Sequence, residues 1–167
     1  MELSQAIAGR RSVRKYRSTA VPPEKLARVL EAARLAPTAA NRQPWKLYVV
    51  RDAALKRAIG VAYKNPWFYE APLVLVMCAL PDSAWTRVDG RNYADIDAAI
   101  AFDHLTLAAY AEGLATCWIC AFNAQAVKDA LKLPPGEVPL AMTPLGAPAE
   151  DPAPTPRKPL EDLVVYR

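Results

Sequence analysis

The stretch "APLVLVMCAL", residues 71–80, decides how the rest of this sequence folds. It is the longest apolar run in the chain, and its valines and leucines favour a β-strand. A run of this length is far too short to cross a bilayer. We therefore predict a buried strand over 73–80, with the other elements packed around it.

The patterns on either side of this strand predict an α+β fold. Residues 94–112 carry the longest helical pattern, with Ile96, Ile100 and Leu107 on one face, and Gly113 ends it. The other elements are expected as helices over 1–8, 24–36, 53–62 and 124–131, an extended segment over 10–17, an aromatic loop over 65–72, a strand over 45–50 that enters the core, and strands over 114–119 and 138–146. Because they follow no regular βαβ rhythm, we expect a mainly antiparallel central sheet flanked by helices.

Length and composition indicate one domain over residues 1–167. The chain has 167 residues, 53% hydrophobic and 23% charged, which suits a single core. Its three cysteines are too few for a disulfide framework and point to a reducing compartment. Arginines and lysines stand where a secretory signal would place an apolar stretch, so we expect a cytoplasmic protein that does not enter a membrane.

The positive charge is concentrated near the N-terminus. The net charge is +4, and the densest cluster is "GRRSVRKYR", residues 9–17. No basic face with interleaved aromatic residues recurs elsewhere in the sequence. This distribution argues against a nucleic-acid groove and for a localised anion site.

The C-terminal end reads as an arm. The prolines of "APAEDPAPTPRKP", residues 147–159, forbid a helix or a sheet interior and favour an extended chain over a surface. The apolar segment "LEDLVVYR", residues 160–167, then needs something to pack on. We expect that segments are exchanged between subunits, with the arm 147–167 on the partner.

Side chains suited to acid–base, covalent or metal chemistry are scarce. No glycines are close enough for a dinucleotide fingerprint or a phosphate loop. The only histidine, His104, lies inside a predicted helix without a zinc or hydrolase pattern around it, and reads as a packed or half-exposed helix residue. We therefore expect no metal site and no catalytic side chain, and expect a cofactor to carry any reaction.

The C-x-x-C pair in "TCWIC" invites a redox interpretation. A redox dithiol places its first cysteine at a helix N-terminus, where the dipole lowers the thiol pKa. Cys117 and Cys120 instead lie in the strand-like stretch "GLATCWICAF". We predict that both are small buried hydrophobes, and one pair cannot complete a four-ligand zinc site.

The segment "RRSVRKY" is the best candidate for the anion site. In an extended chain, Arg10, Ser12 and Arg14 point to one face and Arg11 to the other, which makes a cradle for a phosphate. By itself, the segment is better interpreted as a run of charges exposed to solvent. Two distant stretches favour an anion site instead. The stretch "PTAANRQPW" supplies the amides and hydroxyl of Thr38, Asn41 and Gln43, and "PRKP" supplies Arg157 and Lys158.

With these motifs the chain resembles the nitroreductase family of FMN-dependent oxidoreductases, in one of its compact forms. Four elements follow the family's order over nearly the whole length: "RRSVRKY", "APTAANRQPW", "EGLATCWICAF" and "LGAP…PRKPLEDLV". Two positions depart from it, since many relatives carry glycine near Ala115 and Cys120.

The resemblance implies a homodimer with two FMN molecules at the subunit interface. It assigns the FMN phosphate and ribityl chain to one subunit, and it places a loop of the other subunit against the flavin. The implied cofactor-binding residues are Arg10, Arg11, Ser12, Arg14, Arg157 and Lys158 on the first, Pro37, Thr38, Ala39, Asn41 and Gln43 on the second, Trp118, Ile119, Cys120 and Ala121 along the isoalloxazine, and Asn65 at the pyrimidine edge.

The implied activity is two-electron transfer from NADH or NADPH to an electron-poor small molecule, such as a nitroaromatic or a quinone, by a ping-pong mechanism. The aromatic residues Trp67, Phe68 and Tyr69 would line the acceptor pocket, or simply pack. The alternatives are a specialised flavoenzyme of the same family (a dehydrogenase, a dehalogenase or a flavin-cleaving enzyme), a flavin-binding module without turnover, and a small basic nucleic-acid binder.

Overall fold

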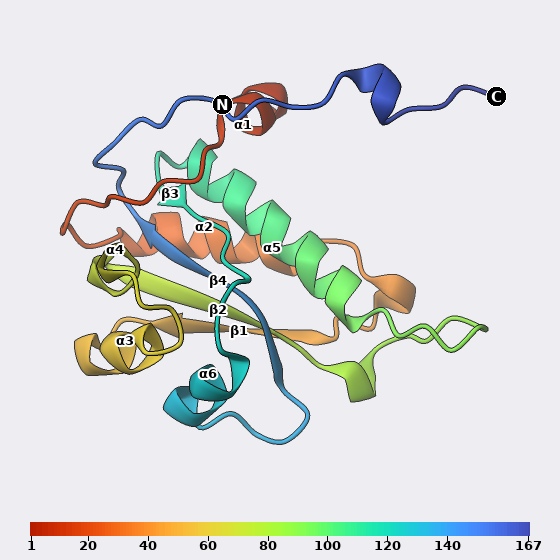
Figure 1. Ribbon diagram of the computed structural model, residues 1–167, viewed down its shortest axis with the longest axis horizontal. Coiled ribbons are helices and arrows are strands. Elements are labelled where there is room, and N and C mark those ends of the chain that lie inside the picture. Colours follow the sequence, from red (N-terminus) through yellow and green to blue (C-terminus); the bar gives the residue numbers. More distant parts are fainter.

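The strand predicted from "APLVLVMCAL" lies inside the sheet. In the computed structural model, which describes residues 1–167, β2 (Leu73–Ala79) pairs with a strand on each side, and all 7 of its residues are buried. The sheet has four strands in the order β1-β2-β4-β3, and every neighbouring pair is antiparallel. The predicted α+β fold with an antiparallel sheet is confirmed (Figure 1).

Most other elements also form where the sequence predicts them. Pro23 begins α2, and the side chains of Asp52 and Asn123 accept N–H groups in the first turns of α3 and α6. The helices are α1 (Leu3–Gly9), α2 (Pro23–Arg34), α3 (Ala53–Gly60), α4 (Pro66–Glu70), α5 (Ala94–Ala111) and α6 (Ala124–Leu131). The other strands are β1 (Trp45–Val50), β3 (Ala115–Thr116) and β4 (Val138–Gly146), and short 3-10 turns are η1 (Ala39–Asn41), η2 (Pro81–Ser83) and η3 (Leu160–Asp162).

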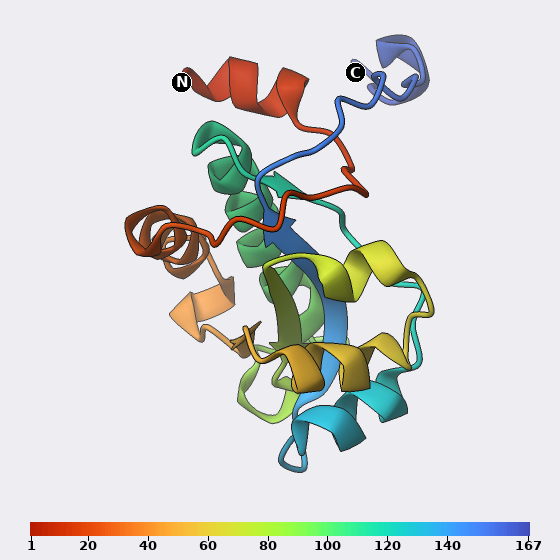
Figure 2. The ribbon, with the colours of Figure 1, turned by 90° about the vertical axis from the view of Figure 1, so that its left-hand side faces the viewer.

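Alternate residues of β2 belong to two separate hydrophobic cores. Leu73, Leu75 and Met77 pack with residues of α2 and α5, whereas Val74 and Val76 pack with residues of α3, α4 and α6. Successive side chains of a strand point to opposite faces, so a run that is apolar at every position needs cover on both sides. Figure 2 shows the helices on the two faces of the sheet.

Helix α5 runs along one of these faces from end to end. It has 18 residues, and Ala98, Ala101 and Ala109 are fully buried, which lets the helix lie close to its neighbours. Gly113 follows with φ of +72°, a left-handed conformation that ends the helix. His104 is half-buried on α5, as expected. In Figure 1 α5 runs diagonally from the hairpin that precedes it toward α1, which packs against it.

The aromatic stretch 65–72 is a helix, not the predicted loop. Pro66 occupies the first turn of α4, where its missing N–H costs nothing, and Phe68 is fully buried in the second core. Tyr63 packs edge-on against Phe68, with ring centroids 5.6 Å apart. Burial of aromatic rings therefore outweighs the low helix propensity of this sequence.

One strand prediction also needs correction. The strand expected over 114–119 has only two residues, because the Cys117 N–H bonds to the side-chain oxygen of Thr143 (2.9 Å) instead of continuing the ladder. The strand predicted over 45–50 forms as β1 and reaches the core, where Val50 is buried and Trp45, Leu47 and Val49 pack against the first core. It is an edge strand, and the Lys46 side chain is exposed.

The C-terminal arm leaves the body after β4. Its first residues pair with the N-terminal segment, through Arg17 N–H to Ala147 O and Ala149 N–H to Lys15 O, both 2.9 Å. The residues from 153 onward are exposed, and the tail shows Leu163, Val165 and Tyr166 to solvent. In Figure 1 the tail extends outward beside α1. None of the helices has both the length and the apolar character that crossing a membrane requires.

Candidate functional site

The arginine segment lies extended along the edge of the sheet, as predicted. Ser12 forms a parallel bridge with Thr116, the N–H of Val13 donates to Thr116 O (3.0 Å), and Val13 is buried. Tyr16 pairs with Pro148 at the start of the C-terminal arm. One buried valine thus fixes the backbone of the segment, while its polar neighbours remain near the surface.

A cavity of about 390 Å³ brings the two ends of the chain together. Arg10 and Ser12 line it from the N-terminal segment, and Thr155 and Arg157 line it from the arm. The sequence predicted that Arg10, Ser12 and Arg157 would meet, but it did not single out Thr155. Arg14 and Lys158 do not line this cavity.

Arg11 departs from the alternation expected of an extended segment. Its guanidinium folds back and donates to Ala8 O (2.6 Å) and Arg10 O (2.9 Å), at the end of α1. A cation at this position satisfies carbonyl groups that a helix end leaves free. Arg11 therefore lines the same cavity as Arg10 instead of facing away from it.

The guanidinium groups of this site are not neutralised within the chain. The chain has four ion pairs, and none involves Arg10, Arg11, Arg14 or Arg157. The nearest acid in the arm, Glu150, accepts the backbone N–H of Arg14 (2.5 Å). Unpaired guanidiniums together with a hydroxyl form a donor set that suits a phosphate.

The segment after β3 presents free backbone donors. Ile119 is buried and exchanges two hydrogen bonds of 2.9 Å with Met142, whereas Trp118, Cys120 and Ala121 are exposed. The N–H groups of Cys120 and Ala121 donate to no acceptor in the chain. Trp118 is fixed by edge-on packing against Phe102, with ring centroids 4.7 Å apart. The N–H groups of Cys120 and Ala121 can therefore donate hydrogen bonds to the acceptor atoms at the edge of a bound ring.

The two cysteines of "TCWIC" have different surroundings. Cys117 is buried, and its burial raises the pKa of its thiol against the opposing effect of Arg14. Cys120 is exposed, so the prediction that both are buried is wrong for it. Its sulfur accepts the indole N–H of Trp118 (2.9 Å), and it faces outward because burial alternates from Cys117 to Cys120. Both thiols are free.

The polar loop 37–43 is an exposed, closed turn around η1. Gln43 N–H donates to Thr38 Oγ1 (3.1 Å), and the Gln43 amide donates to Asn41 O (3.1 Å). Ala39 N–H donates to the carboxylate of Asp97 on α5, at 3.0 and 3.1 Å. The loop is thus attached at the beginning of α5.

The loop and the arginine segment lie at opposite ends of α5. Asp97, in its first turn, holds Ala39, whereas Tyr110, near its end, lines a second cavity together with Arg10. The helix rises 1.5 Å per residue, so these two positions are about 20 Å apart. Within one chain, therefore, the structure does not bring together the two groups of residues that the sequence singled out (Figure 1).

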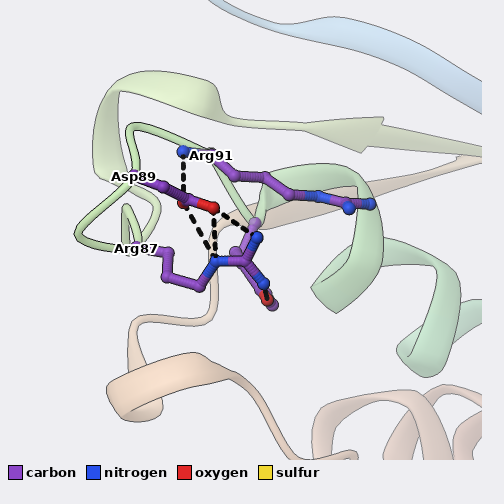
Figure 3. Close-up of polar contacts among 4 residues, drawn as sticks. Arg87, Asp89 and Arg91 are labelled. Atoms are coloured by element: carbon purple, nitrogen blue, oxygen red, sulfur yellow. Dashed lines mark hydrogen bonds and ion pairs between the residues drawn. The ribbon is translucent and has the colours of Figure 1, made fainter.

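A hairpin over residues 84–93 is closed by an antiparallel bridge between Thr86 and Asn92. Arg87 donates to both oxygens of Asp89, at 2.9 and 3.0 Å from Nε, and Asp89 also accepts the N–H of Arg91 (Figure 3). No sequence pattern predicts this hairpin, because Arg87 and Asp89, which pair with each other in it, are ordinary surface charges. Its base, at Tyr93, leads directly into α5.

The remaining predicted residues lie apart from these groups. Asn65 precedes α4 and lines none of the cavities that contain the arginines. Trp67 and Tyr69 are partly buried against the second core, and Phe68 is fully buried. All three aromatic residues pack within this chain, and their lining of an acceptor pocket stays a prediction.

Several known proteins are similar to this chain over most of its length. A model of the nitroreductase family matches residues 7–62 and 58–147. An NADH dehydrogenase from Thermus thermophilus is 32% identical over 100% of this chain and 97% of its own length. An FMN reductase [NAD(P)H] from Bacillus subtilis is 32% identical over 96% of this chain and 71% of its own. The crystal structure of a nitroreductase family protein from Clostridium difficile superposes with a TM-score of 0.91 at 35% identity, over 99% of this chain and 98% of that one.

Proposed function

This chain belongs to the nitroreductase family, and on that basis we propose that it reduces electron-poor small molecules with an FMN held between two subunits. It is an oxidoreductase, and its cofactors are FMN and a reduced nicotinamide, as in the relatives named above. The cytoplasm is its proposed place of action. The acceptor, the subunit arrangement and the residue roles below are proposals.

The residues around the 390 Å³ cavity fit the phosphate end of FMN. Arg10, Arg11 and Arg157 carry positive charge that no carboxylate neutralises, and Ser12 and Thr155 add hydroxyl donors. Charge-assisted hydrogen bonds from such groups are the strong ones. We propose that these five residues hold the phosphate and the ribityl chain, with Arg14 and Lys158 adding positive charge nearby.

The free N–H groups of Cys120 and Ala121 suit the other end of the cofactor. When bound, FMN accepts a hydride from the nicotinamide and passes two electrons to an acceptor. Fixed N–H donors and cations stabilise negative charge that develops next to them. The chain's single histidine lines none of the main cavities, so we propose no side chain as a proton-transfer group and a ping-pong use of one open site.

One observation supports a site shared between two subunits: the loop 37–43 and the arginine segment are separated by most of α5. If both groups contact one FMN, they must come from different chains. The exposed apolar side chains of the tail, among them Leu160, Leu163 and Tyr166, need cover that a partner would provide. We therefore propose a homodimer with two equivalent sites and with the arm 147–167 on the partner.

Mixed dimers test this arrangement. One subunit carries Arg10→Ala with Arg157→Ala, the other carries Thr38→Ala with Asn41→Ala, and two different affinity tags isolate the mixed species. A shared site predicts one doubly damaged site and one intact site, hence one tightly bound FMN per mixed dimer and almost none in either parent. If each chain holds its own FMN, both sites of the mixed dimer are damaged, and the proposal fails.

The acceptor requires a separate experiment. We expect the FMN-loaded protein to oxidise NADH or NADPH under anaerobic conditions in the presence of a nitroaromatic or a quinone. Tight FMN binding without turnover on any acceptor would favour a flavin-binding module. Halide release from a halogenated aromatic, or fragmentation of the flavin, would favour a specialised member of the family.

A further inference from the structure

Asp97 makes the only hydrogen bonds that tie the loop 38–43 to a distant part of the chain. Its two carboxylate oxygens accept the N–H of Ala39, at 3.0 and 3.1 Å. Every other hydrogen bond of the loop joins its own residues to one another or to Trp45. Between its two ends, the loop's only polar contact with the body therefore comes from one side chain of α5.

The loop needs such a tie because its backbone is unfavourable. Ala40, Asn41 and Gln43 have φ values of 50°, 54° and 50°. Residues other than glycine avoid this left-handed region, and a conformation of this kind persists only where its surroundings impose it. Without the bond to Asp97, the loop has no polar contact with the body that opposes its relaxation to an ordinary turn.

The surroundings of Asp97 suit a fixed acceptor. The residue is 1% exposed, and none of the chain's ion pairs includes it. It lies in the first turn of an 18-residue helix, whose dipole favours a negative charge there. Burial prevents water from replacing the Ala39 N–H, so the carboxylate and the loop are held in one arrangement.

We propose that Asp97 is a positioning residue that sets the loop 38–43 of one subunit for the FMN of the other. The inference rests on the proposed function, which places this loop against the flavin. Helix α5 thereby serves both sites of the dimer: its beginning fixes the loop for the partner's cofactor, and its end lies next to the arginine segment of its own. Neither the family match nor the motif pattern assigns Asp97 a role.

Three variants test the proposal. Asp97→Ala removes the acceptor, whereas Asp97→Asn keeps one oxygen that can accept the Ala39 N–H. Asp95→Ala is the matched control, because Asp95 is an exposed acid of the same helix turn and has no hydrogen-bond partner in the chain. For each variant, hydrogen exchange of residues 38–43 is measured in the flavin-free protein. The FMN affinity and the visible circular dichroism of the bound flavin are measured in the FMN-loaded protein.

We expect Asp97→Ala to lose protection at Ala39, to bind FMN at least about tenfold more weakly and to change the flavin's circular dichroism, as for a lost hydrogen bond to a charged group. Asp97→Asn should recover part of each effect, and Asp95→Ala should match the unmodified chain. A mixed dimer of Asp97→Ala with the Arg10→Ala, Arg157→Ala subunit should regain one tight site.

Unchanged FMN affinity and circular dichroism in Asp97→Ala would overturn the proposal, even if the melting temperature falls, because a purely structural role predicts that pattern. If Asp97→Ala does not fold, Asp97→Asn decides: a partial loss of loop protection with a matching partial loss of FMN affinity supports the acceptor role, and loss of binding with normal loop exchange refutes it. Failure of the unmodified chain to bind FMN would instead refute the proposed function, while the exchange data would still report whether Asp97 holds the loop.

Discussion

Gly9, the last residue of α1, lies directly against the phenol ring of Tyr110 near the end of α5. A Cβ atom on Gly9 would stand 2.6 Å from Cζ of that ring, closer than carbon atoms approach one another. Arg10 follows immediately, so the contact between α1 and α5 sets where the arginine segment begins. The packing of two helices thus controls the geometry of the anion cavity.

Gly9→Ala should therefore affect stability and binding together. Overpacking of this kind costs about 1–3 kcal/mol, and we expect a lower melting temperature and weaker FMN binding in a fluorescence titration. Adding Tyr110→Leu to Gly9→Ala should make room for the methyl group and restore part of both. Wild-type melting and FMN affinity in Gly9→Ala alone would contradict this account.

Arg10→Ala and Arg157→Ala should each weaken FMN binding with little effect on the fold, since both residues line the surface cavity. A hydrogen bond to a charged group contributes about 1.5–3 kcal/mol, which corresponds to roughly a ten- to hundredfold change in dissociation constant. Lys15→Ala is the control, because Lys15 is an exposed cation of the same segment whose side chain has no partner. Equal losses in all three variants would mean that net charge, not the cavity, attracts the cofactor.

Replacing both cysteines of "TCWIC" with alanine should leave NAD(P)H-dependent turnover largely intact. Cys117 is buried, so its truncation should lower the free energy of unfolding by about 1 kcal/mol. Cys120 is exposed, and its replacement removes only the contact to the Trp118 indole. A double variant that keeps FMN but loses steady-state turnover would assign the reaction to the sulfurs.

Glu137 should make stability depend on pH in the acid range. Its burial favours the protonated form, but hydrogen bonds from Lys46 and Tyr48 outweigh this effect and hold the pKa of the carboxyl below its ordinary value of 4.5. Because the pKa is lower in the folded state, the stabilisation is complete above about pH 4.5 and is lost as the pH falls through the folded value. Glu137→Gln should remove about 1–3 kcal/mol at neutral pH and flatten the acid limb of a urea denaturation series.

Two comparisons check the assignment of that pH dependence. The exposed pair of Glu31 with Arg34 offers a control, and Glu31→Gln should change the same curve only slightly. Burial and the hydrogen bond to Glu137 also raise the pKa of Tyr48 to about 12, so it contributes a second loss of stability between about pH 10 and 12. Tyr48→Phe should reduce that alkaline loss but not abolish it, because burial also raises the pKa of Cys78 and Tyr16. An alkaline limb unchanged by Tyr48→Phe would assign the whole loss to those groups.

The parts of the fold that the sequence predicted correctly rest on local patterns. Strand β2 and helix α5 are recognisable from the spacing of their own apolar residues, and Asn123 from its place before a helix. The arginine segment and its extended form were also recognisable. The chemistry of guanidinium groups around a hydroxyl requires no knowledge of the rest of the chain.

Two of the features that sequence reasoning missed depend on partners far away in the chain. Asp97 and Ala39 are 58 positions apart, and Glu137 lies 91 positions from Lys46, so no local spacing could link them. The other two are local: Arg11 turns inward to carbonyl groups at the end of α1, and Cys120 is exposed because burial alternates along 117–120. Long-range hydrogen bonds therefore explain the first two outcomes and not these.

The prolines of the C-terminal arm bear on how two chains would assemble. Fixing the backbone of one flexible residue costs about 1–2 kcal/mol of conformational entropy. A proline whose ring already matches the final conformation lowers that cost by about 0.4–1 kcal/mol. The arm carries five of them before its tail, at 148, 152, 154, 156 and 159. The arm is therefore stiff and extended before it contacts a partner. Docking it on a partner would restrict far fewer conformations than docking a glycine- or serine-rich tail of equal length.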